Sequence, residues 1–335
     1  MTGVVLLPRT RPPATAGEAP RAASTFDALG TRCRVIVESR AGGPDPGEAV
    51  VAVRRLLDEA ERRLSRFRPD SDLSRLNAEP DEVVPVVPLV ADALASAVDA
   101  AVRTGGLLDP TVLPALVAGG YAESRRGVPP VGLLAALRDA PPRRPAGPAA
   151  ERRWADVRVS RRDGTVRRPP GVRLDVGATA KGWLADRCAA LLHPFDRWAV
   201  DLGGDLRVGG PQALARPFAV AVAGPLGGTP VGRLWLGQGA VATSGVDRRL
   251  WRRPDGTPAH HLIDPATGEP AWTGLLTATA VAPTAEEAEA VAGATLLRGP
   301  AGVDRLALRG GLAVDDDGRV HRRPTDRRGA WRWSA

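Results

Sequence analysis

The pattern of apolar and polar positions predicts strands and amphipathic helices along most of the chain. Residues 31–38 alternate polar and apolar side chains, which is the period of a half-buried strand. After a Gly/Pro-rich break, apolar residues recur every three or four positions from about residue 46, and they do so again over residues 89–104. Gly105 and Gly106 stand where a left-handed helix cap is expected. Both of these later stretches are therefore predicted to be helices.

The second half of the chain carries shorter apolar runs between turn residues. They predict strands at 172–176, 198–202, 218–223, 240–243 and 276–282. Helical spacing predicts helices at 180–192 and 284–298. Because strands and helices do not alternate regularly, the order favours an α+β fold with mixed or antiparallel sheets over a doubly wound sheet.

Composition divides the chain into regions. Residues 1–24 are rich in Pro, Ala, Thr and Arg without periodicity, and they are predicted to be a disordered leader. A main domain is predicted over 25–300, with a variable Pro- and Arg-rich stretch at about 124–171 that holds one possible helix at 131–140. Residues 301–335 are predicted to form C-terminal strands and a basic tail.

Location and charge give further expectations. The apolar run at residues 4–7 is too short for a secretory or membrane-spanning segment, so we expect no transmembrane segment and a cytoplasmic protein. The formal charge is +8, but the arginines are scattered rather than gathered with aromatic residues on one face, so no nucleic-acid partner is expected. Cys33 and Cys188 lack metal-ligand spacing and are predicted to be buried small hydrophobes.

The most informative segment is residues 173–188, where an apolar stretch leads into a glycine-bearing turn and then a helix. Backbone N–H groups at a helix start favour anions, and a lysine adds a mobile positive charge. Lys181 is the only lysine among the 46 basic residues, which suggests an ammonium group that arginine cannot replace. The alternative is a surface lysine without a function.

Three more segments could carry chemistry. Residues 201–205 combine paired glycines with two aspartates, which is a weak signal alone. Thr243 and Ser244 precede Gly245 after an apolar strand, where hydroxyl and N–H groups can converge on an anion, although a plain turn is an equal alternative. His261 lies three residues before Asp264 and could transfer a proton, although a strand followed by a turn explains the same residues without catalysis.

Taken in chain order, these motifs resemble those of the FAD:protein FMN transferases, the ApbE-like family. The resemblance runs from about Phe26 to Gly299. Its motifs are ALGT at 28–31, LSRFRPDSDLSRLN at 64–77, LDPTV at 108–112, LDVGATAKG at 174–182, GGD at 203–205, TSG at 243–245 and HLIDP at 261–265. Each motif is modest by itself, but their succession in the family's order is specific.

The resemblance implies two α+β subdomains around a flavin cleft. It also implies that the enzyme moves FMN from FAD to a Thr or Ser hydroxyl of an acceptor protein and releases AMP. FAD would be bound by Leu29, Phe67, Asp109, Asp175, Lys181, Thr243 and Ser244. His261 is the implied base, and Asp264 is its implied catalytic neighbour. An acceptor loop similar to Asp-x-[Ser/Thr]-Gly-Ala-[Ser/Thr] would belong to the partner.

At the positions that the resemblance implies for magnesium ligands, this chain offers fewer oxygen atoms than the family does. The backbone carbonyl of Ala178 would be one ligand, and the family's Asp and Thr positions are Glu289 and Gly293 in this chain. Glutamate can still offer an oxygen, whereas glycine offers no hydroxyl, which water or Thr295 would have to replace. This leaves open a slower transferase, a different ion, or a catalytically inactive FAD-binding protein. An FAD pyrophosphatase, which would produce FMN and AMP with water as the acceptor, is a further alternative.

Overall fold

The computed structural model describes residues 3–7, 20–125, 127–128, 131–308, 310–323 and 330–333. Its helices are α1 (Pro46–Leu64), α2 (Asp72–Ala78), α3 (Pro88–Thr104), α4 (Leu113–Ala118), α5 (Leu133–Asp139), α6 (Ala180–Leu192) and α7 (Ala285–Arg298), with 3-10 helices η1 (Arg153–Asp156) and η2 (Gly299–Leu308). No helix in these ranges is long and apolar enough to cross a membrane.

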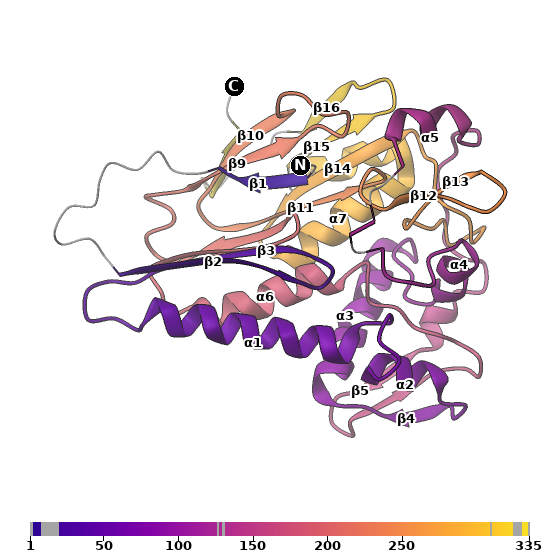
Figure 1. The fold of residues 1–335 in the computed structure, drawn as a ribbon, viewed down its shortest axis with the longest axis horizontal. Coiled ribbons are helices and arrows are strands. Elements are labelled where there is room, and N and C mark those ends of the chain that lie inside the picture. Colours follow the sequence, from indigo (N-terminus) through magenta and orange to yellow (C-terminus); the bar gives the residue numbers. More distant parts are fainter. Residues whose placement is uncertain are drawn as a thin grey trace.

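An eight-stranded antiparallel sheet forms the centre of the molecule (Figure 1). Its strands, in spatial order, are β16 (Val320–Arg323), β15 (Gly311–Asp315), β14 (Leu275–Ala282), β11 (Gly239–Gly245), β8 (Asp205–Gly209), β7 (Arg197–Leu202), β3 (Thr31–Glu38) and β2 (Arg21–Ala28). The antiparallel pairing together with the helices confirms the predicted α+β class. The division into two subdomains stays a prediction.

The remaining strands form three smaller sheets. The first contains β1 (Gly3–Leu6), β9 (Phe218–Ala223), β10 (Gly232–Leu236) and β17 (Trp331–Trp333); the second contains β4 (Val83–Pro85), β6 (Thr165–Arg167) and β5 (Arg158–Ser160); the third pairs β12 (Leu250–Arg252) with β13 (Pro258–His260).

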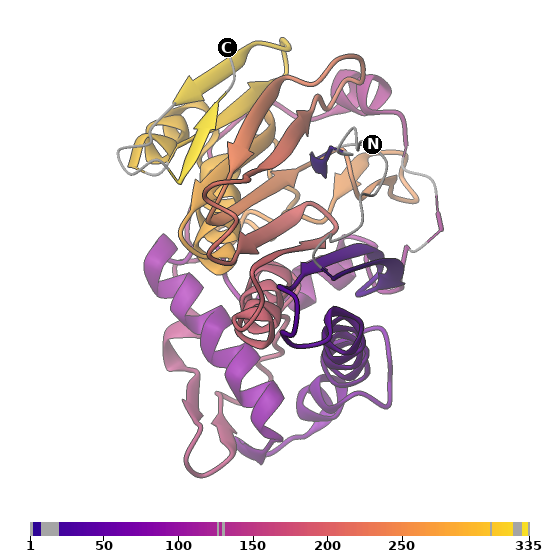
Figure 2. The ribbon, with the colours of Figure 1, turned by 90° about the vertical axis from the view of Figure 1, so that its left-hand side faces the viewer.

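The central sheet buries both of its faces. On β3, Val35 and Val37 point into a core shared with α1 and α6, whereas Ile36 points into a second core with the β1–β9–β10 sheet. Strand β7 divides in the same way, with Val200 on the helical side and Ala199 on the other. The alternation seen in the sequence therefore separates two buried layers (Figure 2).

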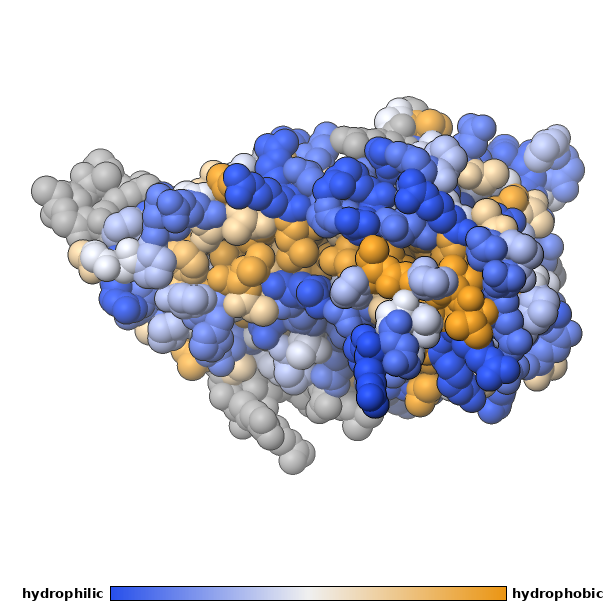
Figure 3. Space-filling model, turned by 90° about the horizontal axis from the view of Figure 1, so that it is seen from below, coloured by the Kyte–Doolittle hydropathy of each residue, from blue (hydrophilic) through white to orange (hydrophobic). Residues whose placement is uncertain are grey.

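The surface below the helical layer carries exposed apolar residues (Figure 3). It is formed where α1, α2 and β4 lie lowest in Figure 1, and it carries a band of apolar residues between strongly polar margins (Figure 3). Val51 of α1 and Val83 of β4 are exposed apolar residues on these elements. The band lies on the side of the molecule opposite the sheet that contains β9 and β10 (Figure 1).

The strand predicted at 172–176 is absent, which corrects the sequence interpretation. The side chain of Asn77 binds the backbone of Leu174 on both sides: Leu174 N donates to Asn77 Oδ1 at 2.7 Å, and Asn77 Nδ2 donates to Leu174 O at 2.8 Å. Asp175 N donates to Pro110 O at 2.8 Å. Because these partners already bind the backbone groups, the segment does not join a β-ladder.

The predicted disordered leader is also wrong in part. Residues 3–6 form β1, which pairs with β9. Val4 and Leu6 are buried in the core between the central sheet and the sheet that contains β9 and β10. Strand β2 begins at Arg21, inside the same predicted leader. Residues 8–19 lie outside the described residues.

The stretch at 124–171 contains α5, η1, β5 and β6. Arg168, which follows β6, is only 2% exposed and donates to the carbonyls of Val172, Leu76 and Glu79 at 2.8, 2.6 and 2.6 Å. It thereby ties this stretch to α2. Both cysteines are free and buried, as predicted, and burial raises the pKa of each thiol to about 12.

Helices α6 and α7 cap each other. On α6, the carboxylate of Asp186 accepts from Ala285 N at 3.0 Å and from Glu286 N at 2.9 Å, at the start of α7. On α7, Glu289 accepts from Gly182 N at 2.9 Å, at the start of α6. Each carboxylate satisfies N–H groups that have no partner inside the other helix.

We expect Asp186→Ala to lower the free energy of unfolding by about 1–2 kcal/mol, because it removes the acceptor of two N–H groups at the start of α7 and leaves Thr284 as the remaining cap. Asp186→Asn keeps one acceptor oxygen and should lower the free energy of unfolding less. Urea unfolding monitored by circular dichroism measures both changes. An unaltered midpoint for Asp186→Ala would show that this cap does not contribute to stability.

Candidate functional site

The turn before α6 and the Asp109 loop lie against each other. Asp175 N donates to the carbonyl of Pro110, which joins the two predicted motifs. Asp109 Oδ1 accepts from Thr111 N at 2.7 Å and from Thr111 Oγ1 at 2.6 Å. Burial raises the pKa of Asp109, although these two bonds oppose the shift. The Asp109 carboxylate thus shapes its own turn and supports the loop beside Asp175.

Asp175 faces positive charge. Its Oδ1 lies 3.8 Å from Arg66 Nε, and both side chains are largely buried. Burial raises the pKa of Asp175, while Arg66 and Arg249 act in the opposite direction. Arg66 Nη2 is buried and has no hydrogen-bond partner among the described residues.

Aromatic rings and guanidinium groups stack beside Asp175. The ring centroids of Phe67 and Tyr121 are 5.4 Å apart, and those of Tyr121 and Trp251 are 5.3 Å apart. Arg66 lies over the Phe67 ring at 4.1 Å and over the Tyr121 ring at 4.5 Å. Arg249 lies 5.9 Å from the Tyr121 ring. Such a cluster offers flat apolar surface together with positive charge.

Sequence reasoning found Phe67 but missed the other members of this cluster, which are Arg66, Tyr121, Arg249 and Trp251. Arg66 lies inside a quoted motif, and Tyr121 is the only tyrosine of the chain. Either fact could have drawn attention to them. Arg249 and Trp251 lie next to and within β12 and carry no comparable signal.

Lys181 joins the start of α6 to β8 and α7. Its ammonium group contacts the carboxylate of Asp205 and lies 3.1 Å from Glu289 Oε1. Burial opposes the charge on Lys181, but Asp205 and Glu289 together raise its pKa above its ordinary value. Burial raises the pKa of Glu289 as well, against the effect of Lys181. The lysine is therefore held charged between two carboxylates.

His261 lies beside this positive region. Burial first, and then Arg249, His260 and Lys181, lower the pKa of His261 well below its ordinary value of 6.5. Its Nδ1 atom has no hydrogen-bond partner among the described residues. A neutral imidazole with a free nitrogen can accept a proton. The neighbouring His260 is fully buried with its ring edge against Trp272, and burial lowers its pKa to about 3.

Asp264 does not orient His261. Its Oδ1 accepts from Gly147 N at 3.0 Å and from Ala266 N at 3.1 Å, and its Oδ2 accepts from Thr267 Oγ1 at 3.0 Å. The carboxylate is 4% exposed, so these bonds define its role. Asp264 thus holds the turn after His261, and its catalytic role stays a prediction.

The remaining FAD-binding candidates lie on two strand ends. Leu29 and Gly30 form the tight turn between β2 and β3 with φ of 55° and 66°, and a Cβ at Gly30 would lie 3.8 Å from Arg249 Nη2. Thr243 and Ser244 end β11, next to Ala242, which pairs with Asp205 of β8. The hydroxyl groups of Thr243 and Thr279 are 2.8 Å apart. Both groups thus lie close to the cluster of charges.

The residues implied for magnesium do not form a suitable ligand set. Both oxygens of Glu289 are occupied, one by Gly182 N–H and one by Lys181. Gly293 offers no oxygen, and the Ser244 hydroxyl is 3.7 Å from where its Cβ would stand. Ala178 contributes at most one carbonyl. Thr295 is buried six positions after Glu289, about 120° around the helix, so it does not replace the missing hydroxyl.

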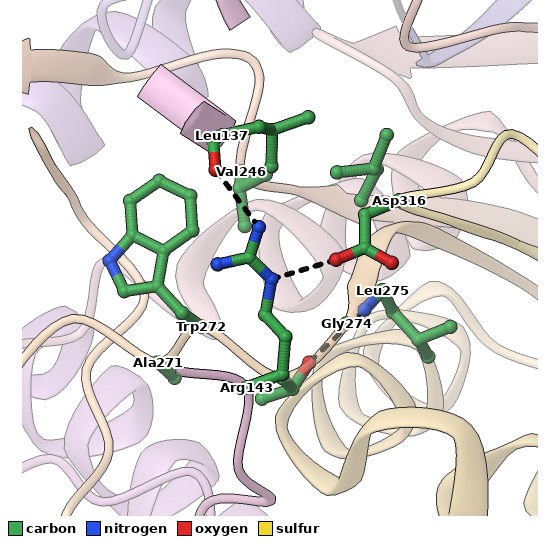
Figure 4. Close-up of a pocket in the computed structure, with 10 residues that line it drawn as sticks. Leu137, Arg143, Val246, Ala271, Trp272, Gly274, Leu275 and Asp316 are labelled. Atoms are coloured by element: carbon green, nitrogen blue, oxygen red, sulfur yellow. Dashed lines mark hydrogen bonds and ion pairs between the residues drawn. The ribbon is translucent and has the colours of Figure 1, made fainter. Parts of the chain in front are cut away.

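A small pocket lies away from these residues, between α5, the start of β14 and the turn after β15. Arg143 occupies it: its Nε donates to Asp316 Oδ2 at 2.7 Å, and its Nη2 donates to Leu137 O at 3.2 Å (Figure 4). Trp272 lies beside the guanidinium group. An internal ion pair therefore fills this pocket.

Comparison with known proteins places the chain in a family. A model of the ApbE family matches residues 29–314. This chain belongs to the ApbE family. The resemblance inferred from the motifs is thereby confirmed.

Relatives within the ApbE family match most of the chain. The FAD:protein FMN transferase of Treponema pallidum is 32% identical over 284 residues, covering 81% of this chain and 77% of the relative. That of Escherichia coli K12 is 27% identical over 266 residues, covering 77% and 73%. The crystal structure of the ApbE protein from Thermotoga maritima superimposes with a TM-score of 0.73 at 26% identity, covering 90% of this chain and 96% of that one. The flavin transferase ApbE from Vibrio cholerae, at 23% identity and a TM-score of 0.69, supports the fold alone.

We expect the His261 imidazole to stay neutral in the folded chain as the pH falls through about 6.5, because burial and the facing cations disfavour its charged form. Its ring resonances in NMR spectra should not shift in that range. Arg249→Gln removes one facing cation and should raise the pKa of His261. In denaturant, all four histidines should titrate near 6.5, which serves as the control. A folded-state midpoint near 6.5 would contradict this description.

We expect Asp264→Ala to lower the free energy of unfolding by about 1–3 kcal/mol, because it leaves the N–H groups of Gly147 and Ala266 without an acceptor. Asp264→Asn retains an acceptor at Oδ1 and should be milder. Thermal unfolding of the two variants compares them directly. Equal stability of Asp264→Ala and the parent chain would refute the structural role.

Proposed function

We propose that this chain is an FAD:protein FMN transferase, which moves FMN from FAD to a hydroxyl group of an acceptor protein. Membership of the ApbE family and relatives bearing that name support the proposal. The observation that carries it is the position of His261, whose pKa is lowered by burial and by the charges of Arg249 and Lys181, and whose buried Nδ1 has no hydrogen-bond partner among the described residues. A transferred phosphoryl group needs both an acceptor for a proton and fixed positive charge.

The proposed reaction is a single displacement. The acceptor hydroxyl oxygen bonds to the phosphorus on the FMN side of the pyrophosphate, and the hydroxyl proton passes to the imidazole of His261. The bond between that phosphorus and the bridging oxygen breaks, and AMP leaves with the bridging oxygen. Positive charge from Arg249 and Lys181 offsets the negative charge that develops on the phosphoryl oxygens.

The FAD-binding roles are part of the same proposal. Phe67 supplies an aromatic face for a ring of FAD, and Asp175 offers an acceptor for a polar group of the nucleotide. Lys181, Thr243 and Ser244 would bind phosphate oxygens. Leu29 and Asp109 would support the binding surface from the hairpin and from the Asp109 turn. A cytoplasmic acceptor protein remains the expectation; magnesium is left out because the donor set does not fit it.

Purified chain incubated with FAD, Mg²⁺ and an acceptor domain bearing the implied Ser/Thr motif should release AMP and yield an acceptor with covalent flavin fluorescence. His261→Ala should slow both by about 10²-fold or more. His193→Ala is the matched control, because His193 is exposed at the end of α6. Mass spectrometry of the acceptor and chromatography of AMP measure the two products.

Other products would support one of the alternative functions. AMP with free FMN and an unmodified acceptor would establish an FAD pyrophosphatase instead. FAD that is bound but left intact would establish a flavin-binding protein. Either outcome would overturn the transferase proposal.

A further inference from the structure

A fixed ammonium group lies at the place where the family resemblance implies a metal ion. Lys181 connects the first turn of α6 with Asp205 of β8 and Glu289 of α7. Its side chain is 26% exposed, whereas those of Asp205 and Glu289 are 2% and 7% exposed. One cation thus bridges two buried carboxylates, which is an arrangement that a divalent ion commonly forms.

The neighbouring residues favour the lysine over a metal ion. Glu289 reaches both Lys181 and the backbone N–H of Gly182. That approach requires glycine at 182, because a Cβ there would lie 2.9 Å from Glu289 Oε2 and 2.6 Å from Ala285 O. A metal ion at Glu289 would share the carboxylate with the ammonium group, whose positive charge would repel it.

Glycine at position 293 offers no side-chain ligand. It lies one helical turn after Glu289, on the same face of α7, and a Cβ there would lie 3.0 Å from Leu108 Cδ2. An apolar side chain therefore borders the space where a ligating hydroxyl would begin. Magnesium sites usually use one or two carboxylates, with water and substrate phosphates completing the octahedron. Here the Glu289 carboxylate is shared with Lys181, and position 293 adds no oxygen.

Lys181 still has capacity for a ligand. An ammonium group has three N–H donors, and Asp205 and Glu289 accept two of them. The third N–H is left for an oxygen atom approaching from the exposed side. A phosphate oxygen is the chemically matched acceptor.

We propose that Lys181, fixed by Asp205 and Glu289, is the cation that neutralises the pyrophosphate of FAD in this chain, and that the chain binds and cleaves FAD without a divalent metal ion. The inference rests on the proposed function, but it has readouts of its own. Lys181 contacts the substrate phosphate, whereas Asp205 and Glu289 position the ammonium group.

The first experiment compares FAD binding and AMP release by the full chain in EDTA and in saturating Mg²⁺. Flavin fluorescence gives the dissociation constant, and Mn²⁺ electron paramagnetic resonance reports directly whether a divalent ion binds, with and without FAD. We expect FAD affinity and AMP release to change less than about tenfold between the two conditions, with no tight Mn²⁺ site. A larger stimulation by Mg²⁺, or a tight Mn²⁺ site that includes Glu289, would overturn the inference.

Variants test the position of the charge. Lys181→Gln should weaken FAD binding in EDTA and slow AMP release by about 10²-fold. Glu289→Gln should slow AMP release and leave it insensitive to Mg²⁺, whereas Glu286→Gln on the same helix is the matched control, because Glu286 pairs with Arg103 at the surface. Glu289→Asp combined with Gly293→Thr restores the family's two ligand types and should gain Mg²⁺ dependence. If the parent chain depends on Mg²⁺ as strongly as this double variant, the inference is wrong.

The two proposals fail in different ways. FAD bound equally well in EDTA and in Mg²⁺ but never cleaved would overturn the transferase and the metal-free cleavage, and it would retain Lys181 as the phosphate-binding cation. FAD bound and cleaved only with Mg²⁺ would keep the transferase and overturn the internal cation. No FAD binding under either condition would overturn both.

Discussion

The mutual capping of α6 and α7 is the constraint on which the site depends. Asp186 and Glu289 each accept N–H groups from the start of the other helix, so the two N-termini are fixed side by side. Gly182 lets the backbones approach, because any side chain there would collide with Ala285 O. Carboxylates at helix starts are stabilised by the helix dipoles as well as by the hydrogen bonds. Lys181 is presented at this junction, over the end of β8.

Because of this junction, a substitution of Glu289 affects both a helix cap and the position of Lys181. Glu289 caps α6 and holds the ammonium group at the same time. A shorter carboxylate would have to give up one of these partners. The replacement of the family's Asp and Thr by Glu289 and Gly293 is therefore consistent with a site built around an internal cation. Local stability and chemistry depend on the same carboxylate.

The second feature of the site is its uneven distribution of charge. Arg66, Arg249 and Lys181 come from three separate parts of the chain. The partly buried ring of Phe67 and the buried rings of Tyr121 and Trp251 cluster with Arg66 and Arg249. The low polarity of this region strengthens each electrostatic interaction. The same environment keeps His261 neutral, because a further positive charge there would be both buried and repelled. The proposed base and the proposed anion-binding surface thus depend on one arrangement.

Local sequence patterns predict correctly the bounds of those strands and helices in which buried positions recur at a regular spacing. Strands β3 and β9 and helix α6 have the predicted bounds, because alternate or helical burial repeats along each segment. The motif order also predicted that Lys181, Asp175 and His261 belong to one site. Long-range contacts account for the missing strand at residues 172–176, for the strand at residues 3–6 and for the turn held by Asp264. The tertiary structure alone placed Arg249 against Tyr121 and the Glu289 carboxylate on Gly182. These outcomes depend on contacts between distant segments, and no local pattern of side chains specifies which distant group will bind a free N–H or face a buried charge.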